Sequence, residues 1–381
     1  MDVPQTGNQD PTNATSQGQA QNPKNNLIRG KTVYVDLIRT VAMLGVPLLH
    51  AAGRWTITPQ ELQQLTLPDF FTWAVVDIYQ SIAVMGVPLF LMLTGALLLQ
   101  PEKTDTLVGF FKKRWNRIGL PTIFWGSAYF AWDFLVLNIP FGIATIVQGI
   151  LNGPYTQFWY LYVLVGLYLF TPILRVFISH GEPAVVKYFV FLWIVGVSIL
   201  PLFSLITGFE LTDNIITVTG YVGYMVLGTY LSTMRLPRKP LAIASVVGIA
   251  LTAVLTYVLA DTLGGQDMYF FQQYFSPTVI LSSVALFLLL LTVKPPSVAQ
   301  ENNLSITQRL IKLISINTLG IFLIHVMINE SIQMGFFGFA INRDLLNPII
   351  EVPLLAMIVL FISLAIIATL RKVPYVNRLI G

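Results

Sequence analysis

The stretch DLIRTVAMLGVPLLH, residues 36–50, decides the fold because it places two ionisable side chains, Arg39 and His50, inside an apolar segment. With its apolar neighbours this segment reaches about 20 residues, the length that crosses a bilayer as a helix. The spacing puts Arg39 and His50 on one helix face, about 16 Å apart along the axis. Ionisable groups inside a span are costly, which indicates a functional site. The alternative is that Arg39 pairs with Asp36 and His50 caps a helix end.

The composition of the whole chain agrees with a membrane protein. It has 381 residues, of which 55% are hydrophobic and only 10% charged, and its mean hydropathy is +0.71. A soluble domain is about 25% charged, so we expect an all-α polytopic membrane protein. The net charge of +4 does not indicate nucleic-acid binding, because the basic residues fall in short loops. Cysteine is absent, which excludes thiolate metal sites, and no metal is expected.

Apolar segments of bilayer-crossing length follow a polar N-terminal tail. We place ten of them, at 33–53, 73–99, 118–138, 158–178, 184–206, 216–233, 240–260, 275–293, 313–333 and 348–370. The tail, residues 1–28, has little to bury and is predicted to be disordered, whereas 29–381 form one transmembrane domain. Alternate loops carry most of the Lys and Arg residues. This pattern predicts that both termini are cytoplasmic, in a multi-pass protein of the cell membrane.

Carboxylates in the second and third spans are candidate partners for His50. Asp77, Gln80 and Ser81 follow helical spacing near the outer end of the second span, at the depth expected for His50. Asp133 reaches a similar depth in the third span. A neutral histidine can take a proton from a hydroxyl when a carboxylate orients it. Spacing does not choose between Asp77 and Asp133, and either one can instead bind substrate.

A second buried histidine lies in the ninth span, in the stretch NTLGIFLIHVMINE. Asn329 is one turn beyond His325, and Asn317 and Thr318 precede it on the same face. Such a polar stripe must point into the protein, away from lipid. Helix–helix hydrogen bonding and a substrate path both explain it.

Basic residues gather before the third span, in FFKKRWNRIGLP, 110–121. Arg114 and Arg117 are one turn apart, which suits clamping of a phosphate, and Lys113 is adjacent. The alternative is that these side chains are ordinary membrane-surface anchors. The aromatic run at 158–170, FWYLYVLVGLYLF, starts with an interfacial belt and is expected to serve mainly in packing.

In several of these stretches the chain resembles the integral-membrane acyltransferase-3 family of bacterial O-acyltransferases. The similar pieces occur in the family's order and are RTVAMLGVPLLH (39–50), VPLFLMLTGALLL (87–99), KKRWNRIGLP (112–121), FWYLYVLVGLYLFTPILR (158–175) and TLGIFLIH (318–325). One departure is Thr94, where the family more often has Ser. The chain also lacks the extracellular SGNH-type domain that some members carry, so a relay through such a domain is not expected.

The resemblance implies transfer of an acyl group, most commonly acetyl, from cytoplasmic acyl-CoA to a hydroxyl of a sugar-containing acceptor. It implies that His50 is the essential base, that Arg39 belongs to the acyl-donor site and that Arg114 and Arg117 form an arginine pair. Expected partners are therefore acyl-CoA as co-substrate, a carbohydrate or lipid-linked glycan, and the bilayer. A Ser81 ester intermediate has no support in the sequence.

The rival interpretation is a secondary transporter or exporter of a polar solute, because buried charges also suit an ion-coupled pathway. The two halves of the chain show no matching pair of Gly/Pro-broken spans, the usual sequence sign of such transporters. The sequence leaves open the acceptor, the acyl length and the oligomeric state.

Overall fold

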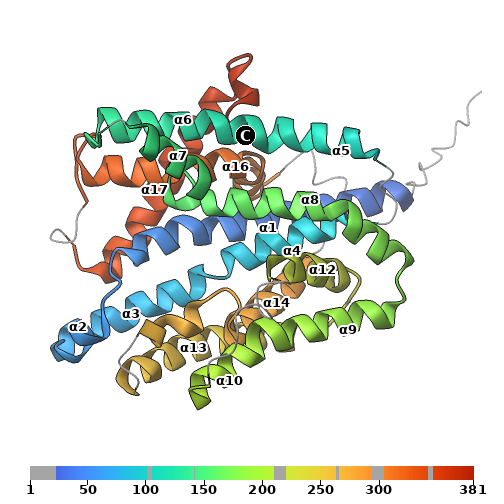
Figure 1. The fold of residues 1–381 in the computed structure, drawn as a ribbon, viewed down its shortest axis with the longest axis horizontal. Coiled ribbons are helices and arrows are strands. Elements are labelled where there is room, and N and C mark those ends of the chain that lie inside the picture. The colour runs from blue at the N-terminus through green and yellow to red at the C-terminus, as the bar shows by residue number, and fades with distance from the viewer. Residues whose placement is uncertain are drawn as a thin grey trace, which may run out of the picture.

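The computed structural model describes residues 23–100, 105–140, 142–209, 220–262, 266–293, 304–341 and 346–381, and for residues 23–32, Pro59 and Gln63 only the backbone. These residues form helices and no strands (Figure 1). The tail predicted at 1–28 falls mostly on residues outside this set. The fold is thus an all-α bundle, as the composition predicted.

The helices of the N-terminal half are α1 (Pro23–Gly53), α2 (Pro59–Gln63), α3 (Leu67–Ala83), α4 (Gly86–Leu98), α5 (Leu107–Arg114), α6 (Leu120–Leu135), α7 (Ile143–Asn152) and α8 (Trp159–His180). Those of the C-terminal half are α9 (Pro183–Ile194), α10 (Leu200–Thr207), α12 (Gly220–Ser232), α13 (Arg238–Thr262), α14 (Pro277–Leu291), α16 (Ile306–Gln333) and α17 (Pro348–Leu370). Short π or 3₁₀ turns complete them, at η1 (Trp115–Gly119), η2 (Thr156–Phe158), η3 (Val195–Ile199), η4 (Gln266–Gln272) and η5 (Val376–Arg378).

Eight helical stretches of the described chain are long and apolar enough to cross a membrane. They agree with a multi-pass membrane protein. The spans predicted at 118–138 and 216–233 are not among the eight, since α6 covers 16 residues and α12 covers 13. Residues 216–219 of the second of these lie outside the described chain. The count of ten stays a prediction.

Helix α1 runs through the middle of the molecule and packs on α16, α17, α3 and α4 (Figure 1). The contact with α3 and α4 is close because glycines face it: a Cβ on Gly45 would lie 2.8 Å from the Ala83 carbonyl oxygen, and one on Gly86 2.8 Å from that of Ala42. A larger residue at either position would push backbone against backbone. This contact brings α1 close to the junction of α3 and α4.

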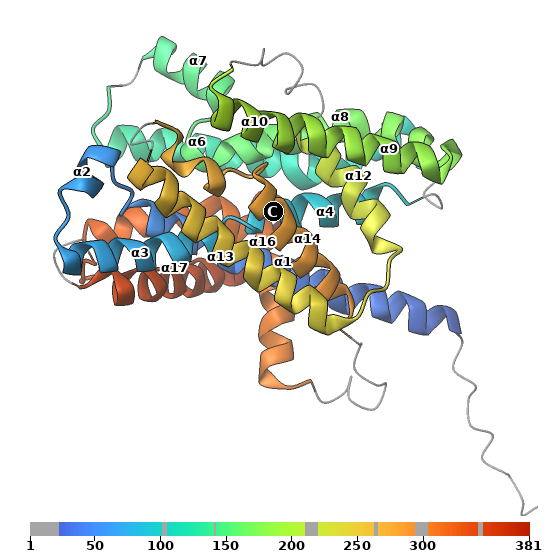
Figure 2. The same cartoon turned by 90° about the horizontal axis from the view of Figure 1, so that it is seen from below.

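The second predicted span is one segment in the sequence but two helices in the structure. The break lies at Val84 and Met85, between α3 and α4. Pro88 explains it, because proline has no N–H to donate to the carbonyl of Val84 and its ring disfavours helix there. Helices α13 and α14 lie side by side, and the first turns of α16 project beyond the bundle (Figure 2).

Candidate functional site

A cavity of about 490 Å³ opens among α1, α4, α5, η1, α8, α16 and the residue that follows α17, and four arginines line it. Arg39 comes from α1, Arg114 and Arg117 from α5 and η1, and Arg371 from the end of α17. The remaining lining is apolar or weakly polar and includes Tyr160, Leu164 and Tyr168 of α8. The structure therefore brings the three arginines singled out in the sequence into one cavity and adds a fourth.

The cavity is strongly cationic, since the described residues that line it include no acidic side chain. The Nε atoms of Arg114 and Arg371 are buried and have no hydrogen-bond partner within the described chain. Burial lowers the pKa of both guanidiniums, and the positive charge of Arg117 lowers each of them further. Unpartnered buried donors and unbalanced like charges are costly in a bare protein. The arrangement suits a ligand that carries several negative charges.

Arg114 is held in place by aromatic rings. Its Cζ lies 5.1 Å from the centroid of Phe110 and 5.5 Å from that of Tyr168, distances typical of cation–π contacts. The chain between Arg114 and Gly119 forms a π turn, in which Leu120 N–H donates to the carbonyl of Trp115. Pro121 accounts for this turn because it lacks the N–H of a regular helix, and π turns are frequent at functional sites.

Arg39 has no ion pair with Asp36 among the residues described. Instead, the Ser315 hydroxyl of α16 donates a hydrogen bond to Asp36 Oδ1 at 2.6 Å. The local pairing that the sequence offered as an alternative is therefore not formed. Asp36 joins α1 to α16, and the half-buried guanidinium of Arg39 is left to the cavity.

His50 and His325 meet between α1 and α16. Their ring centroids are 4.9 Å apart, and the rings meet edge to face. His325 is fully buried. The sequence singled out each histidine but did not pair them, because 275 positions separate them in the chain.

The hydrogen bonding of His325 determines where its ring carries the proton. Nδ1 lies 2.6 Å from the carbonyl oxygen of Phe322, and a carbonyl can only accept, so Nδ1 carries the proton. In the neutral ring Nε2 then has a free lone pair. This atom is buried and has no hydrogen-bond partner in the described chain. His325 thus presents a basic atom beside His50.

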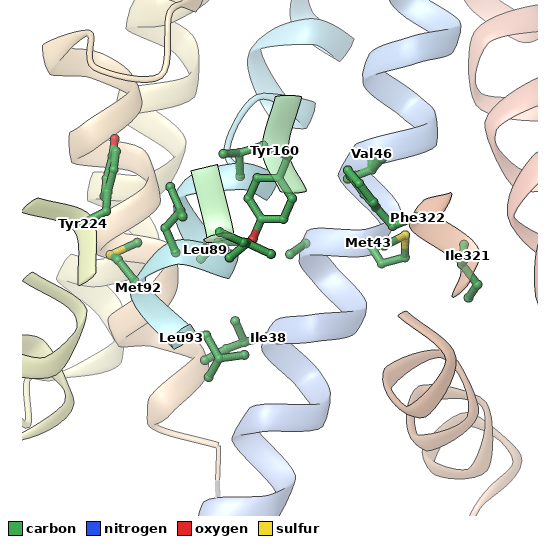
Figure 3. Packing of buried hydrophobic residues seen from close by; sticks show 14 of the residues in the cluster. Ile38, Met43, Val46, Leu89, Met92, Leu93, Tyr160, Tyr224, Ile321 and Phe322 are labelled. Atoms are coloured by element: carbon green, nitrogen blue, oxygen red, sulfur yellow. The ribbon is translucent and has the colours of Figure 1, made fainter. Parts of the chain in front are cut away.

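A second, smaller pocket of about 30 Å³ adjoins His50. Tyr160 and Phe322 line both this pocket and the arginine cavity, and their ring centroids are 5.3 Å apart. Figure 3 shows Tyr160 between α1 and α4, with its hydroxyl toward the Ile38 side. We call this smaller space the histidine pocket; its other lining residues are Val46, Leu49, Ala83, Gly86, Val87, Gln157, Trp159 and Tyr274.

The polar residues predicted on α3 are buried, but none of their hydrogen bonds in the described chain goes to His50. Asp77 Oδ1 accepts a hydrogen bond from Gln272 Nε2 at 2.5 Å. The amide of Gln80 donates to the Thr56 hydroxyl at 3.3 Å. Ser81 is fully buried, and its hydroxyl has no partner in the described residues. No hydrogen bond joins Asp77 to His50 in this part of the chain.

Asp133 of α6 lies near Glu330 of α16, close enough for the two carboxylates to repel each other. Glu330 itself accepts hydrogen bonds from Trp132 Nε1, at 2.9 Å, and from the Tyr155 hydroxyl. Asp133 and His50 share no hydrogen bond within the described ranges. The pairing of His50 with a carboxylate, which spacing left open between Asp77 and Asp133, is thus not seen in either form.

Two other predicted residues also have defined places. Lys113 forms an ion pair with Asp105 at 2.6 Å, is 64% exposed and does not line the arginine cavity. Asn329 is buried one turn beyond His325, and its Oδ1 has no hydrogen-bond partner in the described chain. His180 is exposed.

Sequence reasoning missed Arg371, Gln157 and Tyr160. Arg371 follows the last span, where a basic residue looks like a topology signal. The aromatic run at 158–170 was assigned to packing, yet Tyr160, Leu164 and Tyr168 line the arginine cavity. Their spacing of four residues marks one helix face and was the available signal.

Comparison with known proteins identifies a family. The family model described as an acyltransferase domain (acyltransferase-3) matches residues 32–368, nearly the whole chain. The matched range contains Arg39, Arg114, Arg117, His50 and His325. No curated protein and no solved structure matches the chain.

Proposed function

The chain belongs to the acyltransferase-3 family, and we propose that this membrane acyltransferase moves an acyl group from cytoplasmic acyl-CoA, normally acetyl-CoA, to a hydroxyl of a sugar-containing acceptor. One observation carries the proposal: a cavity lined by four arginines shares a wall with a pocket that contains His50. The first suits a polyanionic donor and the second suits proton transfer.

The donor half of the proposal rests on charge. Coenzyme A carries a diphosphate and a further phosphate, and guanidiniums form short, charge-assisted hydrogen bonds with phosphate oxygens. Arg39, Arg114, Arg117 and Arg371 would share these phosphates. The unpartnered Nε atoms of Arg114 and Arg371 would gain acceptors on binding. The thioester would then extend past Tyr160 toward His50.

The chemical step transfers the acyl group directly. His50 takes the proton of the acceptor hydroxyl as its oxygen attacks the thioester carbonyl. The new C–O bond forms, the C–S bond breaks, and the CoA thiolate leaves with the proton that His50 took. His325 offers an unpartnered acceptor beside the ring in which positive charge develops. The chain has no cysteine for a thiol acyl-enzyme.

The acceptor half of the proposal rests on the family. A surface polysaccharide or a lipid-linked glycan in the cell membrane is the expected acceptor class. The histidine pocket has room for about two water-sized groups, so only the reacting end of such an acceptor enters it. The bulk of the acceptor stays outside.

The direct test is release of CoA from acetyl-CoA by the purified protein in detergent. We expect His50→Ala to lower the rate by about 10²–10⁴, the usual loss for a general base. The matched control is His180→Ala, which removes an exposed histidine and should leave the rate unchanged.

Normal turnover by His50→Ala would show that His50 is structural. Solute transport without release of CoA would instead favour the transporter interpretation. Loss of activity in His180→Ala would show that the assay responds to general damage, and the effect of His50→Ala would then carry no mechanistic meaning.

A further inference from the structure

Gln157, in the turn before α8, is almost completely buried, with 1% of its surface exposed. Its Nε2 lies 3.2 Å from the carbonyl oxygen of Leu323 on α16. Because a carbonyl oxygen only accepts, the atom that faces it must be the NH₂ group. The orientation of the amide is therefore fixed by α16, and Oε1 is the atom that Gln157 can offer to the histidine pocket.

The Oε1 atom of Gln157 is buried and has no hydrogen-bond partner among the described residues. A buried carbonyl oxygen without a donor is costly, and one that lines a pocket calls for a hydrogen-bond donor that enters that pocket. Gln157 lines the histidine pocket together with His50. The missing partner is a hydrogen-bond donor that sits next to the group His50 acts on.

The position of Gln157 just before α8 shows from which side this hydrogen-bond donor enters. The arginine cavity contacts Tyr160, Leu164 and Tyr168, successive turns of α8 that lead away from Gln157. Gln157 lines the histidine pocket and is not among the lining residues of the arginine cavity, from which the shared wall of Tyr160 and Phe322 separates it. An acyl donor that enters through the arginine cavity meets Tyr160 before it reaches Gln157. The ligand of Gln157 is therefore on the acceptor's side.

The pocket volume limits what this ligand can be. About 30 Å³ holds roughly two water-sized groups. One is the hydroxyl from which His50 takes a proton, and the other is the group that donates to Gln157. In an acceptor made of sugars, the commonest second donor next to a hydroxyl is another hydroxyl.

We propose that the histidine pocket selects acceptors with two adjacent hydroxyl groups: one attacks the thioester and its neighbour donates a hydrogen bond to Gln157 Oε1. This inference rests on the proposed function and names the acceptor chemistry. Gln157 is then a specificity-determining residue that contacts the acceptor. An acceptor without the second hydroxyl leaves Oε1 unpaired, which a site built for a hydroxyl strongly disfavours.

The test compares two alcohols that differ by one hydroxyl, trans-cyclohexane-1,2-diol and cyclohexanol, as acceptors from acetyl-CoA with purified protein. We expect kcat/KM of the wild type to be roughly ten- to a hundredfold higher for the diol, the range for one buried hydrogen bond. Gln157→Met keeps the side-chain length but removes the acceptor oxygen. It should lower the diol preference to within about threefold.

The matched control is Tyr129→Phe. The Tyr129 hydroxyl donates to the same Leu323 carbonyl at 2.9 Å and also interacts with the Gln157 side chain. This change therefore weakens the support of the amide and of α16 but keeps the Oε1 atom of Gln157. It should lower both rates together and keep their ratio. A ratio that falls equally in Tyr129→Phe and Gln157→Met would show that Gln157 acts only by supporting α16.

The wild type alone also decides the matter if Gln157→Met fails to fold. Equal rates for diol and cyclohexanol would overturn the inference, as would hydrolysis of acetyl-CoA with transfer to neither alcohol. A change confined to the KM for acetyl-CoA in Gln157→Met would assign Gln157 to the donor instead. Absence of any CoA release would refute the proposed function itself.

Discussion

Two arginines near opposite ends of the first span have opposite surroundings. Arg54, just after α1, forms an ion pair with Glu351 of α17 at 2.9 Å, and the Glu351 side chain is only 1% exposed. Arg39, within α1, has no ion pair in the described chain and lines a cavity without acidic side chains. Arg54 joins two helices, whereas Arg39 faces a cavity that suits an anionic ligand.

The difference lies in where the counter-charge comes from. A buried charge is tolerated when a partner compensates it, and removal of that partner is strongly destabilising. Arg54 has its partner within the fold. Arg39 shares a cavity with three further arginines, and the partner that we propose for it is an anion from outside the chain. Variants at Arg54 should therefore affect folding, and variants at Arg39 should affect the reaction.

The largest expected effect is at the ion pair of Arg54 and Glu351. Glu351→Ala leaves Arg54 without its buried carboxylate and should lower the free energy of unfolding by about 3–5 kcal/mol. Replacement of both residues by Leu should recover most of this loss. Unfolding in detergent, followed by tryptophan fluorescence, measures it. An unchanged stability of Glu351→Ala would remove the contrast between the two arginines.

The second-largest expected effect is at Arg39. Arg39→Lys keeps the charge but loses the planar, bidentate hydrogen bonding of the guanidinium. We expect kcat/KM for acetyl-CoA to fall about 10- to 100-fold, the range for hydrogen bonds to charged groups, with stability nearly unchanged. The double variant Asp36→Asn with Arg39→Leu should not restore activity. If it does, Arg39 and Asp36 serve each other after all.

The smallest effect is at the part of the arginine cavity that α5 and η1 form. Arg114→Gln and Arg117→Gln should each raise the KM for acetyl-CoA about tenfold, because each removes charge-assisted contacts with phosphate. Lys113→Gln is the control, since its exposed pair with Asp105 is worth little. Steady-state kinetics at fixed ionic strength measure all three. Equal KM values would assign the whole basic stretch to membrane anchoring.

Several features of the protein were predictable from the sequence because they depend on local physics. Hydrophobic length and low charge predicted a helical membrane bundle, since a bilayer leaves the backbone few other ways to satisfy its polar groups. Helical periodicity placed Arg39 and His50 on one face and Arg114 near Arg117. The order of the similar segments predicted the family, which the match over 32–368 confirmed.

The sequence could not predict contacts between segments far apart in the chain. The carboxylate partners proposed for His50 were chosen by depth alone, and depth does not tell which helix lies next to which. In the structure, Asp77 accepts a hydrogen bond from Gln272, Asp133 lies near Glu330, and the ring of His50 contacts that of His325. Arg371 and Gln157 gave no local signal, because a basic residue after a span and an amide before one are both common.

By itself, the sequence determined that the protein lies in a membrane, that it is helical, and which residue types are available for chemistry. Only the tertiary structure decided which buried polar group has a partner. Arg54 has an ion pair and Arg39 forms none with the residues that the structure describes, although both belong to the same end of the sequence. The reason is physical. Hydrophobicity and periodicity act along one helix, whereas compensation of a buried charge here requires a side chain from another helix. The packing of the helices decides which side chain lies close enough.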